Sequence, residues 1–153
     1  MKQESGRSLI EIIGVLAIAG VMSASAISIY NVIRNNQARK IASMEMEEIA
    51  KNAKILMGVR GNYNGISVDY LISAGALKNN QAPLGESNWS VEAINNGTGF
   101  SINLTGLSSD ECQYFATAAP KWATKVLING FATDINTSCF STKTNKVSFT
   151  IEE

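Results

Sequence analysis

The fold is decided by the stretch RSLIEIIGVLAIAGVM at residues 7–22, which follows the six-residue segment MKQESG and carries a single acid, Glu11. From Ile12 to Ile29 the chain runs for 18 residues without a charge. A helix of this length measures about 27 Å, close to the roughly 30 Å hydrocarbon core of a bilayer. A carboxylate inside a bilayer costs roughly 2.5–3.5 kcal/mol, so Glu11 is a candidate functional residue.

A secretory signal peptide is the alternative interpretation of the same segment, because the small residues SASA at 23–26 fit a cleavage site after Ala26. The apolar run is longer than the usual ~7–15 residues, and Glu11 interrupts its start. The helical pattern also continues past Ala26. A chain cut there would be a secreted soluble protein, and this hypothesis stays open.

Apolar residues continue at helical spacing beyond the charge-free run. Gly58 and Gly61 then supply a stop signal. We therefore predict one helix from about Ser8 to Met57, about 75 Å long, apolar on all sides over residues 7–30 and amphipathic over 31–57. Six residues, three or four apart, define its apolar face: Ala38, Ala42, Met46, Ile49, Ala53 and Leu56.

Residues 58–153 are predicted to form an α+β head in which a few strands lie against the amphipathic half of the helix. Asn95-Asn96-Gly97 is a hairpin signal between two strand patterns. Ser108 and Glu111 have capping-box spacing at the start of a helix that Pro120 ends or kinks. The remaining expectations are a short helix at 68–74, a loop at 79–88 and strands at 89–94, 99–104, 125–128, 138–141 and 147–151.

Composition excludes several functions. The 13 basic and 13 acidic residues balance, so no strongly basic face is expected and nucleic acid is not expected as a direct partner. The chain has no histidine, which removes the commonest general base and the imidazole metal ligand. Asp110 and Glu111 fit a helix start better than acid–base catalysis. We therefore expect no enzyme, cofactor or metal site.

The two cysteines, Cys112 and Cys139, lie in the C-terminal half. Without histidine a zinc site is disfavoured, and a disulfide formed in an oxidising compartment is favoured over two unpaired buried thiols. The disulfide would place this half outside the cytoplasm. Basic residues on the two sides of the apolar span do not settle its orientation.

Gly6 followed by RSLIE and a long apolar helix resembles the N-terminus of type IV prepilins. In that family a prepilin peptidase cuts after the glycine and N-methylates the new terminus, and the acid five residues beyond the cut is the hallmark. The resemblance implies a leader at residues 1–6, processing at Gly6 and Arg7, and an assembly role for Glu11. Arg7 departs from the usual hydrophobic residue at its position.

Later segments are similar to the type IVb class of pilins. The matching pieces are DYLISAGAL at 69–77, Cys112 near the start of a late helix, and Cys139 shortly before a last strand at 147–151. The resemblance implies the type IV pilin fold, a long N-terminal helix packed on a small antiparallel sheet. A disulfide-bounded region at 112–139 belongs to that head.

The resemblance further implies a structural pilus subunit. The subunit would first be anchored in the bacterial inner membrane, with its head in the periplasm and its helix in the lipid. It would then polymerise into an extracellular filament used for adhesion, aggregation or DNA-related contact. Its partners would be other pilin subunits, the prepilin peptidase and the inner-membrane assembly machinery. A minor pilin or a type II secretion pseudopilin is the related alternative. An adhesive surface is expected between Cys112 and Cys139 and in the loop before Trp89.

Cleavage would create a free amine at residue 7. That amine and the Glu11 carboxylate of a neighbouring chain would attract strongly in an apolar setting, and pairing makes both charges tolerable there. Pairing within one chain is an alternative, because the two groups are about one helical turn apart. The Arg7 guanidinium is a further possible partner of Glu11.

Overall fold

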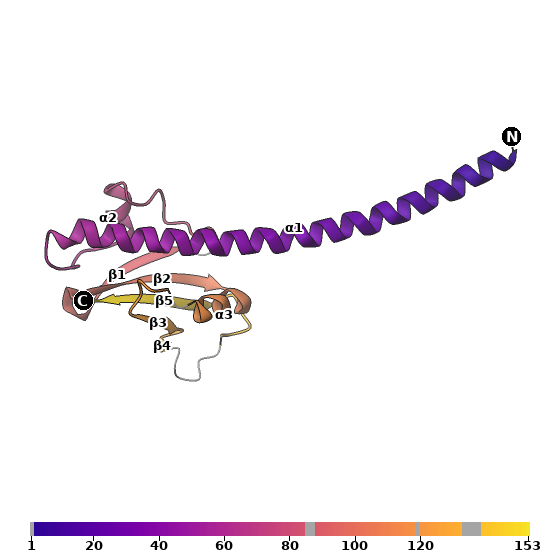
Figure 1. The fold of residues 1–153 in the computed structure, drawn as a ribbon. Helices are drawn as coiled ribbons and strands as arrows, with labels where there is room; N and C mark the ends of the chain where they lie inside the picture. Colours follow the sequence, from indigo (N-terminus) through magenta and orange to yellow (C-terminus); the bar gives the residue numbers. More distant parts are fainter. Residues whose placement is uncertain (1, 85–87, 119, 133–138) are drawn as a thin grey trace. The chain divides into compact units, whose positions relative to one another are not determined.

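The computed structural model describes residues 2–84, 88–118, 120–132 and 139–153. They fall into two compact units, Met1–Gln37 and Ala38–Glu153. The helix α1, Lys2–Gly58, contributes residues to both units (Figure 1). It begins before the predicted Ser8, because the lysine, glutamine and glutamate of the first residues are good helix formers and no proline interrupts them. It ends one residue past the predicted Met57.

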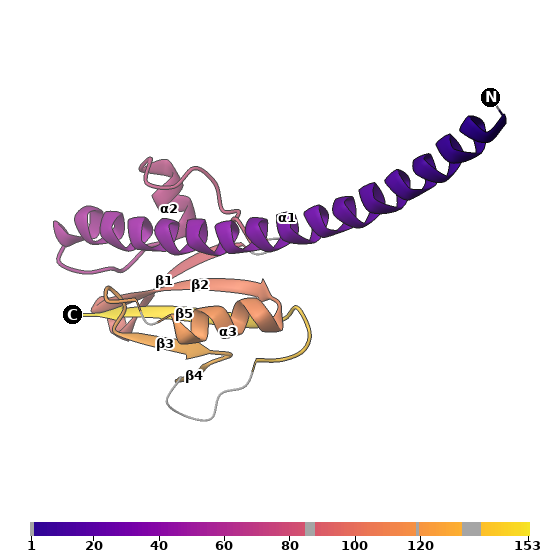
Figure 2. The ribbon, with the colours of Figure 1, turned by 45° about the vertical axis from the view of Figure 1, so that its right-hand side comes forward.

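The head contains one antiparallel sheet of five strands in the order β1-β2-β5-β3-β4 (Figure 2). The first two strands form the predicted hairpin, with Trp89 opposite Leu104 and Ile94 opposite Gly99. Asn95 and Asn96 take positive φ values of 51° and 57° in its turn, a conformation that asparagine tolerates. The strand bounds are β1 Trp89–Ile94, β2 Gly99–Leu107, β3 Lys125–Ile128, β4 Phe131–Ala132 and β5 Asn145–Glu152.

The head's core joins the last part of α1 to one face of the sheet. The apolar face of α1 buries Ala42, Met46, Ile49 and Ala53, while the predicted face residues Ala38 and Leu56 are partly buried. Alternate residues of the adjacent strands β2 and β5 complete this core, as the period of two in a strand requires. They are Phe100, Ile102, Leu104, Val147, Phe149 and Ile151. The predicted α+β class is confirmed.

Two shorter helices form where the sequence predicts them, each with a serine at its N-cap. In α2, Val68–Ser73, the Ser67 hydroxyl accepts the Tyr70 N–H at 3.0 Å, and Gly75 follows with φ 77°. In α3, Ser109–Thr117, the Ser108 hydroxyl accepts the Glu111 N–H at 3.3 Å. These bonds satisfy amides that helix starts otherwise leave unpaired. The helix α3 ends before Pro120, as expected.

The predicted strand at 138–141 is wrong for residues 139–141, which form no strand, and Ser138 lies outside the described residues. The side chain of the fully buried Asn145 makes hydrogen bonds to the backbone of this segment that a neighbouring strand would make in a sheet. Its Oδ1 accepts the Phe140 N–H at 2.7 Å, and its Nδ2 donates to the Phe140 and Thr142 carbonyls at 2.9 and 3.1 Å. A third Nδ2 bond, 3.0 Å long, reaches the carbonyl of Leu107 in β2. Asn145 therefore holds this segment as a loop.

Two smaller differences concern the edges of the sheet. The strand β4 was not predicted, because two residues are too few for a periodic signal. It pairs with β3 through Leu127 opposite Ala132 and Ile128 opposite Phe131. In the predicted loop at 79–88, Gln81 and Asn88 form an isolated β-bridge, while residues 85–87 lie outside the described part of the chain.

Candidate assembly helix and head surface

Every described side chain from Ser8 to Gln37 is exposed, although the segment carries no charge and is mostly apolar from Ile12 to Ile29. Glu11 is the sole acid in this range, and its neighbours Ile10 and Ile12 are 73% and 54% exposed. Among the helices that the structure describes, α1 from Ser8 onward is long and apolar enough to cross a membrane. An apolar surface of this extent requires a cover other than water.

Three serine hydroxyls in this segment are satisfied within the helix. The hydroxyls of Ser23, Ser25 and Ser28 donate to carbonyl oxygens four residues earlier, at 2.7, 2.9 and 3.1 Å. A hydroxyl bonded in this way needs no water, which suits an apolar environment. A Cβ added at Gly14 or Gly20 would meet nothing within 4 Å in this chain. These glycines leave room for another helix to approach closely.

A disulfide joins Cys112 of α3 to Cys139, as predicted. Cys112 is fully buried against the core, and Cys139 is half-buried. The bond closes a segment whose ends are 27 residues apart and which contains most of α3, β3 and β4. It therefore ties the outer part of the sheet to the late helix. Residues 119 and 133–138 of this segment lie outside the described residues, as do residues 85–87 of the expected contact loop before Trp89.

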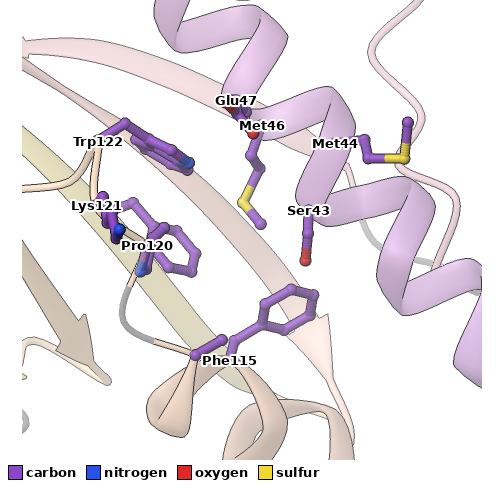
Figure 3. Close-up of a pocket in the computed structure, with 10 residues that line it drawn as sticks. Ser43, Met44, Met46, Glu47, Phe115, Pro120, Lys121 and Trp122 are labelled. Carbon is purple, nitrogen blue, oxygen red and sulfur yellow. The ribbon is translucent and has the colours of Figure 1, made fainter.

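The head has a groove lined by α1, α3, the residues after α3, and β5 (Figure 3). Its volume is about 660 Å³. The rings of Trp122 and Phe149 lie 5.6 Å apart between centroids, and Phe115 meets Phe149 edge-on at 6.1 Å. Met44 and Met46 of α1 also line the groove. This site is apolar, and sequence reasoning missed it because its walls come from segments far apart in the chain.

The two tryptophans of the head, Trp89 and Trp122, differ in burial. Trp89 is buried, and its indole N–H donates to the Glu45 carboxylate at 3.3 Å. Trp122 is half-buried and faces the groove. Asp110 and Glu111 lie in the first turn of α3, where carboxylates favour the helix dipole, as expected. Among the described residues, no group of three or more acids or cysteines is placed to hold a metal ion.

Among the described residues of the head, Tyr63 is the one whose pKa is clearly shifted. Its hydroxyl donates to the Glu153 carboxylate at 2.8 Å, and its ring packs on Phe100 with centroids 4.8 Å apart. Burial, reinforced by the hydrogen bond and charge of Glu153, raises the pKa of Tyr63 to about 12 from the usual 10.0.

A raised pKa in the folded state stabilises the head while Tyr63 stays protonated. This contribution is fully present below pH 10 and is lost as the pH rises through about 12. We expect Tyr63→Phe to lower stability at pH 8 and to flatten its decline between pH 10 and 12. Thermal unfolding of both proteins across this range measures the difference. An equally steep decline in the variant would assign the alkaline loss to other groups.

These elements together define the type IV pilin fold: a long N-terminal helix, exposed and apolar in its first half, whose last part packs on an antiparallel sheet with a disulfide-bounded edge. The chain is similar in structure to TcpA, a type IV pilin from Vibrio cholerae El Tor biotype, with a TM-score of 0.60 and 14% sequence identity. The match covers 74% of this chain and 98% of that chain. No protein-family model and no curated protein matches the sequence.

Proposed function

We propose that this chain is a structural subunit of a type IV pilus, anchored in the bacterial inner membrane until it polymerises into an extracellular filament. The single observation that carries the proposal is the pairing of a pilin-fold head with a helix whose side chains are exposed over residues 8–37 and which carries no charge over residues 12–29. A bilayer covers such a helix before assembly, and a bundle of identical helices covers it afterwards.

In this proposal the domains follow the chain in order. Residues 1–6 are a leader that a prepilin peptidase removes between Gly6 and Arg7. Residues 7–30 cross the membrane and later form the filament core, and residues 31–57 are the amphipathic half of the same helix. The head at 58–153 lies in the periplasm, where an oxidising environment allows the Cys112–Cys139 disulfide. The inner-membrane assembly machinery then extracts the subunit.

Glu11 selects the axial position of each added subunit. Its carboxylate pairs with the residue 7 amine of a neighbouring chain, because each charge alone is costly in an apolar bundle and the pair is tolerated. The small residues at 14, 17, 19, 20, 23, 24 and 26 allow the helices to approach closely enough for that pairing. The region 112–139 stays on the head and supplies the surface for adhesion or aggregation.

The leader gives a direct test of this function. We expect Gly6→Glu to retain residues 1–6 and to form no filaments, because a charged side chain at the cut site obstructs the peptidase. Gly6→Ala is the matched control and should still be cut. Mass spectrometry of the membrane-bound protein and immunoblotting of sheared filaments give the two readouts. Filaments built from uncut Gly6→Glu subunits would contradict the proposal.

A further inference from the structure

The groove on the head offers an apolar interior with a charged rim. Met46 of α1 faces Phe115 and Trp122 across it, whereas Met44 points away from these two rings (Figure 3). Glu47 lies on the α1 wall and is exposed, and Lys121 lies on the opposite wall. The groove therefore suits an apolar side chain whose neighbouring residue carries a positive charge on the α1 side.

The same head carries a matching apolar projection. Val59, in the turn that follows α1, is 93% exposed, more than any other large hydrophobic side chain that the structure describes. The turn is held by two hydrogen bonds, from the Arg60 N–H to the Met57 carbonyl at 3.0 Å and from the Gly61 N–H to the Gly58 carbonyl at 3.3 Å. Met57 is fully buried and anchors it. Val59 is thus presented in a fixed position, next to the exposed Arg60.

Charge is divided along this part of α1. From residue 45 onward the acids come first and the bases follow, ending with Arg60 after the helix, while the bases Arg39 and Lys40 precede the acids. Within the described residues the one ion pair is Lys125–Glu152, so Glu47 and Arg60 have no ionic partner in that part of the chain. Opposite charges at the two ends favour contact between parallel copies that are displaced along the helix axis. The charged residues are Glu45, Glu47, Glu48, Lys51, Lys54 and Arg60.

We propose that the groove receives Val59 of a second copy of this chain, with Arg60 of that copy paired with Glu47. The proposal rests on the pilus function above and adds a head-to-head contact between subunits other than those paired through Glu11, because Glu11 and residue 7 are four positions apart and set a displacement of about 6 Å. Glu47 and Val59 are 12 positions apart, so parallel copies would be displaced by about 18 Å along the axis. Projection and groove lie at different places on one molecule, so the contact is heterologous, and its displacement along the axis lets it repeat without closing into a ring.

A charge exchange tests the pairing in the full-length chain. We expect Arg60→Glu and Glu47→Arg each to lower filament yield about fivefold, as for loss of one surface ion pair and gain of a like-charge contact. The double variant should recover most of that yield, because it restores opposite charges. Val59→Ser should reduce yield about tenfold. Phe140→Ser, which removes another exposed apolar side chain, is the matched control and should assemble normally.

A photo-crosslinking residue at position 59 identifies the occupant. The proposal requires cross-links from position 59 of one chain to residues 43–47 or 120–122 of another. Cross-links to other faces, or full yield in all three single variants, would overturn this contact while leaving the pilus function in place. If the unsubstituted chain forms no filaments in the same experiment, the pilus function itself fails, and this contact with it.

Discussion

Replacing Glu11 by alanine should leave a processed, membrane-resident protein with a folded head that forms few filaments, or none when it is the only subunit. Burying a carboxylate in a bilayer costs roughly 2.5–3.5 kcal/mol, so the change should not weaken membrane residence. What it removes is the partner of the amine at residue 7. Sheared-filament yield, measured beside the amount of membrane-bound subunit, separates assembly from expression.

Two further variants at position 11 separate charge from size. Glu11→Asp keeps the negative charge and should retain part of the yield, whereas Glu11→Gln keeps the size and should behave like Glu11→Ala. The head lies in a separate compact unit, so its thermal unfolding should be the same in all three variants. Normal filament yield from Glu11→Ala subunits alone would discard the pairing mechanism.

Loss of the disulfide is expected to have the second large effect. Closing a loop of 27 residues stabilises a protein by about 3–4 kcal/mol in the chain-entropy model. We therefore expect Cys112→Ser to lower the unfolding temperature of the head by about 10 °C or more. Thermal unfolding of the full chain in detergent, with and without reductant, measures this shift.

Cys139→Ser is the matched control for this variant. Cys112 is fully buried, so serine there also buries a hydroxyl, whereas Cys139 is half-buried and the same change costs little beyond the bond. A comparable loss in both variants, with no further loss on adding reductant, would assign the effect to the disulfide. Unchanged unfolding temperatures in both would remove the disulfide from the stability of the head.

The local elements of the fold could be predicted because their signals are local. Spacing of apolar residues predicts α1, and the asparagine–glycine turn predicts the β1–β2 hairpin. Ser108 with Glu111 predicts the start of α3. Each signal lies within a few residues of the structure that it specifies, so one sequence is sufficient to detect it.

Features made by distant segments could not be predicted. Asn145 bonds the carbonyl of Leu107, 38 residues away, and nothing near Asn145 in the sequence indicates this. The same bonds explain why residues 139–141 are not a strand. The groove could not be predicted either, because α1 and the residues after α3 meet only in the folded head. The proposed roles of Glu11 and Gly6, in contrast, come almost entirely from the sequence.

The most direct test of the account is the mass and N-terminal sequence of the mature protein isolated from cells that carry the pilus machinery. A processed pilin begins at Arg7, methylated or not, and keeps the whole apolar helix with Glu11. A terminus at about Ile27, directly after Ala26, would mean that the helix is a discarded signal peptide. That result would contradict the pilus function, because the released head would lack the segment through which subunits assemble.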